Sequence, residues 1–168
     1  GGWEKSRFMG VELTGKVLGI IGCGNIGSIV ADRALGLKMR VIAFDPFLTR
    51  EHADHLGVEK VELDELFKRA EVITMHTPLT DSTKGILNRD NLARMRDGVL
   101  VVNCARGELV VEADMKEALE SGKVAGFAVD VFPQEPPENY SLFGMEQVVA
   151  TPHLGAATTE AQEKVALQ

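Results

Sequence analysis

The sequence predicts an α/β protein with a doubly wound parallel sheet in a single domain. Apolar runs of strand length alternate along the chain with segments of helical periodicity, an order typical of a parallel sheet covered by helices. The first of these runs leads directly into three glycines spaced G-x-G-x-x-G. The length of 168 residues suits one domain with a sizeable core.

The glycine-rich stretch has the parts that a dinucleotide-binding turn requires. Gly22 permits a tight turn after the strand, Gly24 lets a pyrophosphate approach the backbone, and Gly27 lets the next helix pack closely. Asp45 ends the second apolar run, about 20 residues further on, where a carboxylate can accept hydrogen bonds from ribose hydroxyls. The full pattern predicts a Rossmann-type dinucleotide site. The alternative is a glycine-rich turn of another α/β protein, with Asp45 as a surface turn residue.

Composition narrows the class of protein. The net charge of −7 argues against non-specific binding of nucleic acid, which needs a basic surface. No apolar run reaches membrane-spanning length. Cys23 and Cys104 lack metal-ligand spacing and predict buried thiols in a reducing, cytoplasmic compartment, with no metal. The chain begins at Gly1 rather than Met, so we expect residues 1–168 to be one domain of a longer protein.

The first half of the chain alternates strands and helices around the glycine motif. Residues 1–15 should form a short helix or arm with an apolar face, which includes Trp3, Phe8 and Met9. The helix expected over residues 26–35 has an apolar stripe that should face the core: Ile26, Ile29, Val30 and Ala34. The other elements expected here are strands at 17–21, 39–44, 58–60 and 71–75 and helices at 51–57 and 61–70.

The second half continues the alternation. Asn88 is a good N-cap for a helix over residues 88–95. The continuous apolar run at 99–102 is typical of a strand buried on both faces. The remaining elements expected are a helix at 112–121, strands at 125–131 and 147–150, and a helix that begins after Gly155.

Polar residues follow the apolar runs at the positions where ligands bind in such sheets. These candidates for chemistry are Asp45, Thr77, Arg106, Asp130, Glu135 and His153. An imidazole at His153 can move a proton near neutral pH, Glu135 could orient it, and the forked donors of Arg106 suit a carboxylate. Taken singly, each has a plainer interpretation: a structural histidine, a solvated loop acid and a salt-bridge arginine.

The other histidines predict no chemistry. His52 and His55 lie on a polar segment and are expected at the surface. His76 follows a strand, where it is expected to form a local hydrogen bond.

Several separate segments together resemble one family. They read LTGKVLGIIGCGNIG, FDPF, HTPLTDSTKGILN, VVNCARGELV, AGFAVDVFPQEPP and TPHLGAATTEAQ, and they cover essentially the whole chain. They resemble the D-isomer-specific 2-hydroxyacid dehydrogenases. The resemblance implies an NAD-dependent enzyme whose substrate is a small 2-hydroxy acid. It also implies a second, substrate-binding domain that this chain lacks, so the chain alone should turn over little substrate.

The resemblance also implies roles for individual residues. Arg106 would bind the substrate carboxylate, and Glu135 would pair with His153, the proton donor and acceptor. Asp130 would lie near the nicotinamide carboxamide. The residues expected to contact the cofactor are Gly22, Gly24, Asn25, Ile26, Gly27, Asp45, Pro46, Thr77, Pro78, Cys104, Ala105, Arg106, Asp130, His153, Gly155 and Ala156.

Some points depart from the family pattern or stay open. Glu108 stands where a second glycine is common and Val111 where an acid is common, although the three proposed catalytic residues are intact. The resemblance implies a homodimer formed through this domain, with no nucleic-acid or membrane partner. Reduction of glyoxylate or hydroxypyruvate is an alternative reaction within the family. A transcriptional corepressor that senses dinucleotide is the alternative from another class, and the intact catalytic residues argue against it.

Overall fold

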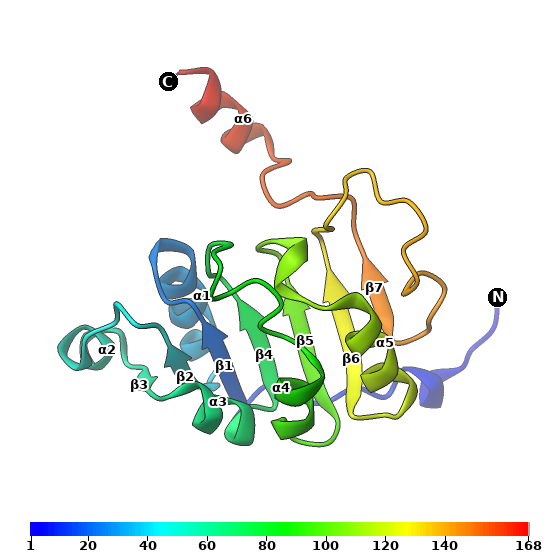
Figure 1. The fold of residues 1–168 in the computed structure, drawn as a ribbon, viewed down its shortest axis with the longest axis horizontal. Coiled ribbons are helices and arrows are strands. Elements are labelled where there is room, and N and C mark those ends of the chain that lie inside the picture. The colour runs from blue at the N-terminus through cyan, green and yellow to red at the C-terminus, as the bar shows by residue number, and fades with distance from the viewer. Residues whose placement is uncertain (168) are drawn as a thin grey trace.

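A seven-stranded sheet in which all neighbouring strands are parallel forms the centre of the computed structural model, which describes residues 1–167. The strand order is β3-β2-β1-β4-β5-β6-β7 (Figure 1). The chain runs outward from β1 to one edge, returns to β4 beside β1, and then runs outward to the other edge. This doubly wound order confirms the predicted fold class.

The elements match the expected alternation, with small differences at their ends. The strands are β1 (Val17–Ile21), β2 (Arg40–Phe44), β3 (Glu59–Lys60), β4 (Val72–Met75), β5 (Val99–Asn103), β6 (Val124–Val129) and β7 (Val148–Ala150). The α-helices are α1 (Asn25–Gly36), α2 (Arg50–Leu56), α3 (Leu63–Arg69), α4 (Arg89–Arg94), α5 (Glu112–Glu120) and α6 (Thr159–Ala166). Two short 3₁₀ helices are η1 (Lys5–Phe8) and η2 (Gly107–Leu109). Asn88 caps α4 as expected, by accepting a hydrogen bond from the Asn91 N–H.

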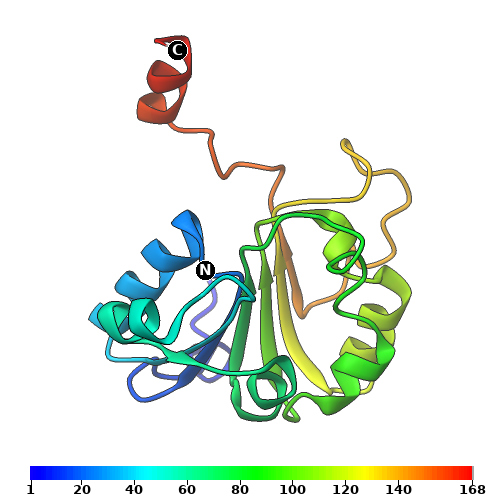
Figure 2. The same cartoon turned by 60° about the vertical axis from the view of Figure 1, so that its left-hand side comes forward.

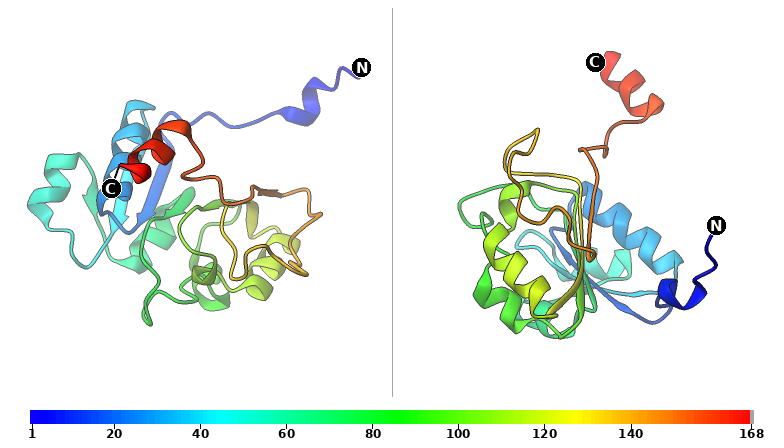
Figure 3. Two further views of the ribbon diagram at one scale, coloured as in Figure 1. Left: turned by 90° about the horizontal axis from the view of Figure 1, so that it is seen from above. Right: turned by 90° about the vertical axis from the view of Figure 1, so that its right-hand side faces the viewer.

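Helices cover the two faces of the sheet unequally (Figures 2 and 3). On one face α3, α4 and α5 bury large side chains, including Phe67, Leu92 and Met115. On the other face α1 and α2 pack against β1 and β2 through a smaller core. None of the helices within residues 1–167 is long and apolar enough to cross a membrane.

The core-facing side of α1 agrees with the prediction only in part, because Ala34 is buried and Val30 is partly buried but the two isoleucines are not. Ile26 and Ile29 are 61% and 52% exposed, while Gly27, Ala31 and Ala34 are buried. The reason is the close approach of the helix to the chain that precedes it. A Cβ on Gly27 would lie 2.1 Å from the carbonyl oxygen of Gly22, so only glycine fits at the start of the inner face, and Ile26 and Ile29 point outward.

The prediction that residues 99–102 are buried on both faces was also wrong. Val99 and Val101 are buried, but Leu100 and Val102 are only half-buried, and Val149 on the neighbouring part of the same face is 65% exposed. No α-helix among residues 1–167 lies over this part of the sheet (Figure 3). The arm that contains η1 leaves the domain on this side.

We expect Gly27→Ala to destabilise the domain by about 1–3 kcal/mol, because the added methyl group overlaps the Gly22 carbonyl. Gly36→Ala in the same helix is the matched control. No atom lies within 4 Å of a Cβ there, so it should be neutral or stabilising by about 0.5–1 kcal/mol. Urea unfolding followed by circular dichroism measures both variants. Equal stability of the two would contradict the close packing of α1.

Candidate functional site

The carboxyl ends of the strands all lie at the same end of the sheet (Figure 1), and the predicted site residues follow these strands in the chain. Asp45 follows β2, Thr77 follows β4 and Asp130 follows β6. The strand order reverses between β1 and β4. Ligands of doubly wound sheets bind beyond the strand ends at such a reversal, so the topology places a binding cleft next to the glycine turn.

The glycine turn leaves the start of α1 open. Gly22 has φ +92°, and a Cβ there would lie 2.6 Å from the His76 carbonyl oxygen, so only glycine suits this position. The N-cap residue of α1, Gly24, supplies no side-chain hydrogen bond to the helix. A Cβ on Gly24 would meet no atom within 4 Å. The first N–H groups of α1 therefore border free space, as a pyrophosphate site requires.

Asp45 is fixed beside this turn by two backbone donors. Its Oδ2 accepts from the Cys23 N–H at 2.8 Å and its Oδ1 from the Phe47 N–H at 2.9 Å. The carboxylate is half-buried, and each oxygen keeps a lone pair for a further donor. The observed geometry thus fits a dinucleotide, with its pyrophosphate at the glycine turn and its ribose hydroxyls at Asp45.

The two cysteines differ in exposure. Cys23 is buried as expected, and burial raises the pKa of its thiol. Cys104 is exposed, so the prediction of a second buried thiol was wrong. It follows β5 directly and lies at the end of the sheet where the strands have their carboxyl ends. Partial burial, with a smaller effect from the charge of Asp130, still raises the pKa of the Cys104 thiol, which therefore stays protonated at neutral pH.

The remaining histidines behave as the sequence predicts. His52 and His55 are exposed on α2. His76 Nε2 lies 2.9 Å from the Thr74 hydroxyl, and burial lowers the pKa of His76. Within residues 1–167 no group of three or more His, Cys, Asp or Glu side chains is placed to hold a metal ion.

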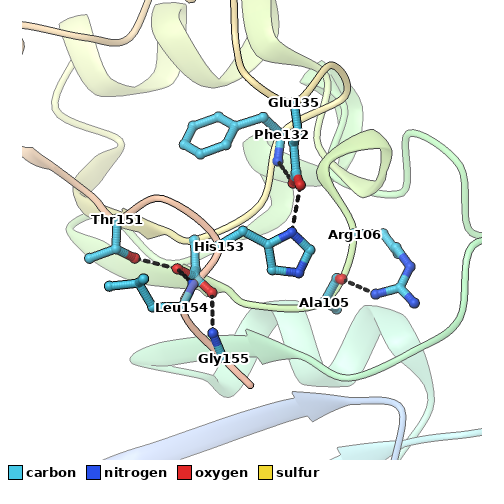
Figure 4. A network of polar contacts seen from close by, with 9 residues as sticks. Ala105, Arg106, Phe132, Glu135, Thr151, His153, Leu154 and Gly155 are labelled. Atoms are coloured by element: carbon cyan, nitrogen blue, oxygen red, sulfur yellow. Dashed lines mark hydrogen bonds and ion pairs between the residues drawn. The ribbon is translucent and has the colours of Figure 1, made fainter. Parts of the chain in front are cut away.

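The three proposed catalytic residues line one open cleft of about 370 Å³. Arg106 comes from the loop after β5, Glu135 from the loop after β6 and His153 from the turn after β7, and Figure 4 shows them around the same space. His153 Nδ1 lies 2.5 Å from Oε2 of Glu135. The sheet topology therefore brings together residues that are 29 and 18 positions apart along the chain.

The charge on Glu135 determines which nitrogen of His153 carries a proton. The hydrogen bond with His153, followed by the bond that Glu135 Oε1 accepts from the Phe132 N–H at 3.0 Å, lowers the pKa of Glu135. An ionised carboxylate only accepts hydrogen bonds, so His153 donates through Nδ1–H. In the neutral ring Nε2 is then the basic nitrogen, and it is the atom available to a substrate in the cleft.

Arg106 has a support that the sequence analysis missed. The buried side chain of Asn103 donates to the Arg106 carbonyl at 2.9 Å and accepts from the Ala105 N–H at 3.1 Å. These bonds fix the turn from which the guanidinium extends. Arg106 itself is exposed, and its Nη1 donates to the Ala105 carbonyl at 2.7 Å, which leaves most of its donors free. The sequence signal that could have identified Asn103 is its amide side chain at the end of an otherwise apolar run.

Asp130 supports the turn that carries His153. Its buried carboxylate accepts from the Thr151 hydroxyl at 2.5 Å, the Leu154 N–H at 2.8 Å and the Gly155 N–H at 3.1 Å. Burial alone would raise the pKa of Asp130, but these bonds and the nearby His153 outweigh it and lower the pKa. Contact between Asp130 and a nicotinamide carboxamide stays a prediction.

Comparison with known proteins points to one family. The sequence profile described as "D-isomer specific 2-hydroxyacid dehydrogenase, NAD binding domain" matches residues 1–155. D-3-phosphoglycerate dehydrogenase of Bacillus subtilis is 51% identical over 166 residues, which are 99% of this chain and 32% of that protein. Hydroxypyruvate reductase of Thermotoga maritima is 48% identical over an alignment of 171 positions, which covers 100% of this chain and 55% of that protein.

Solved structures show the same likeness. A glyoxylate reductase from Paecilomyes thermophila superposes with a TM-score of 0.88 at 39% identity, over 95% of this chain and 48% of that one. The chain therefore spans about a third of the phosphoglycerate dehydrogenase and about half of the two reductases.

We expect His153→Ala to raise the pKa of Glu135, because the hydrogen bond with His153 is the largest cause of its lowering. A lowered carboxyl pKa means that the contact with His153 persists at neutral pH and is lost only as the pH falls through that pKa. Carbon-detected NMR titration of the Glu135 carboxyl group in wild-type and variant chains measures the change. His52→Ala, on the distant helix α2, is the control and should leave the Glu135 titration unchanged. An unchanged titration in His153→Ala would contradict the Glu135–His153 pair.

Proposed function

The chain belongs to the D-isomer-specific 2-hydroxyacid dehydrogenases as their NAD-binding domain, and from this premise we propose that it is the cofactor domain of a D-3-phosphoglycerate dehydrogenase. The full enzyme would oxidise 3-phospho-D-glycerate to 3-phosphohydroxypyruvate, the first step of serine synthesis. The observation that carries the proposal of an active dehydrogenase is the Glu135–His153 pair, which faces Arg106 across one cleft. The choice of substrate is supported by relatives of that name from bacteria, archaea and animals at 46–51% identity.

A second candidate reaction is the reduction of hydroxypyruvate or glyoxylate. Its support is the hydroxypyruvate reductase of Thermotoga maritima, which matches the whole chain at nearly the same identity. In our proposal the substrate domain of the full-length enzyme selects between the two reactions. A panel of 2-hydroxy and 2-keto acids, assayed with the full-length enzyme, distinguishes them. Preference for glyoxylate or hydroxypyruvate over the phosphorylated substrate would overturn the first proposal.

The proposed mechanism assigns one task to each residue of the cleft. NAD, held by the glycine turn and Asp45, would supply the acceptor for the hydride that leaves C2 of the hydroxy acid. His153 Nε2 accepts the proton of the C2 hydroxyl as the carbonyl forms, and Glu135 stabilises the resulting imidazolium. The free donors of Arg106 bind the substrate carboxylate in a forked geometry and orient C2. In the reverse direction His153 returns the proton to the carbonyl oxygen.

We expect the domain to bind NAD much more tightly than NADP. The half-buried carboxylate of Asp45 would accept hydrogen bonds from the ribose hydroxyls and would repel a 2′-phosphate. Asp45→Ala should weaken the binding of NAD and narrow the difference between the two cofactors. Titration calorimetry with both cofactors measures this, and equal affinities in the wild-type chain would remove Asp45 from its proposed role.

We expect this chain to bind NAD yet to turn over little or no 3-phosphoglycerate. The glycine turn and the catalytic residues lie within the chain, but the substrate must also be positioned, and positioning can supply about 7–11 kcal/mol of barrier lowering. In our proposal the substrate domain of the full-length enzyme closes over the substrate and supplies this positioning.

In the full-length enzyme, His153→Ala should reduce kcat by about 10²–10⁴-fold and leave NAD affinity nearly unchanged. NADH absorbance reports turnover. Near-normal turnover by this chain would contradict the role proposed for the substrate domain. Near-normal turnover by the full-length His153→Ala enzyme would contradict the role proposed for His153.

We also propose that the protein forms a homodimer through this domain. The arm exposes Trp3, Phe8 and Met9, and the sheet face near Leu100 and Val149 lacks a covering helix within residues 1–167. An arm exchanged between two copies would cover apolar surface on both. Sedimentation velocity should detect a dimer at roughly tens of micromolar. Only monomer at that concentration would count against it.

For location, we propose the cytoplasm, which the two free cysteines support because they fit a reducing compartment. Cell fractionation tests this proposal, and recovery of the protein from a secreted or oxidising fraction would overturn it.

A further inference from the structure

His153 has an unusual backbone conformation. Its φ is +53°, which is uncommon for a residue other than glycine and requires support from the surrounding structure. Pro152 precedes it, and the His153 N–H donates back to the Thr151 carbonyl at 3.1 Å, which closes a tight turn. A change in this turn would move the imidazole relative to the cleft.

The support comes from Asp130, at the end of β6. Its carboxylate binds the turn on both sides of His153: the Thr151 hydroxyl before it, and the Leu154 and Gly155 N–H groups after it. Figure 4 labels these three donors around His153. The Thr151 N–H also donates to the Val129 carbonyl at 3.0 Å and so fixes the start of the turn to the sheet. Asp130 therefore holds the backbone of His153, while Glu135 holds its ring.

We propose that Thr151 is a positioning residue for the proposed reaction: its hydroxyl orients the Asp130 carboxylate, and that carboxylate holds His153 where Nε2 meets the substrate. Thr151 is the only one of the three donors to Asp130 that uses a side chain. Its hydroxyl can thus be removed without altering a backbone N–H. Without it, the carboxylate loses the donor on one side of the turn and can rotate, which frees the backbone around His153.

The inference rests on the proposed role of His153, so the test includes a readout that does not depend on turnover. In this chain, proton NMR can observe the Nδ1–H of His153, which is hydrogen-bonded to Glu135. In Thr151→Val that signal should be lost or broadened, and in Thr151→Ser, which keeps the hydroxyl, it should remain. Thr49→Val removes the capping hydroxyl of α2, near the opposite edge of the sheet, and should leave the signal unchanged.

In the full-length enzyme, Thr151→Val should lower kcat by about 10–100-fold, the range expected for a misplacement of about 1 Å, with little change in KM or NAD affinity. Thr151→Ser should restore most of kcat, and Thr49→Val should retain it. If Thr151→Val does not fold, Thr151→Ala is measured in its place. Wild-type kcat together with an intact Nδ1–H signal in the variants without the hydroxyl would overturn the inference. A wild-type enzyme inactive on every 2-hydroxy acid would instead overturn the proposed function, and the NMR comparison would still decide the role of Thr151.

Discussion

All seven strands of the sheet run in the same direction, and the site depends on this constraint. Parallel strands have their carboxyl ends at the same end of the sheet, so the loops after β2, β4, β5, β6 and β7 all project toward the same space. Arg106, Glu135 and His153 lie in three different loops, yet they line one cleft. The strand order reverses beside β1, which places the glycine turn at the same end of the sheet. The proposed cofactor site and the proposed catalytic residues therefore share one surface.

Close packing at the glycine turn has consequences for the rest of α1. Because the helix approaches the Gly22 carbonyl so closely, Gly27 faces inward at its start, and Ile26 and Ile29 face outward. Further along the helix, Ala31 and Ala34 are buried and Val30 is partly buried. The same close approach brings the first N–H groups of the helix to the carboxyl ends of the strands. A helix that packed through large side chains would stand further from the strand and would present those groups elsewhere.

Two carboxylates hold the histidine in different ways. Asp130 is buried and accepts three hydrogen bonds from the turn, whereas Glu135 is exposed and binds the imidazole ring directly. Both have a lowered pKa because hydrogen bonds favour their charged forms, so both remain acceptors at neutral pH. Arg106 has a comparable support in the uncharged amide of Asn103. His153 and Arg106 are thus each supported by a polar residue that lies at the end of a strand or in the loop after it.

The order of the elements, the parallel sheet and the glycine turn could be inferred from the sequence alone, because hydrophobic periodicity and glycine spacing are local properties of the chain. The same local reasoning identified Asp45, Arg106, Glu135 and His153 as polar residues after strands. It could not place Ile26 on the outside, because helical spacing shows which residues share a face but not how closely that face approaches a sheet. Nor could it foresee that Thr151 and Asp130 support the turn at His153, or that Leu100 lies under an uncovered face. Those features depend on distances between segments far apart in the chain, which are established only when the strands pair and the helices pack.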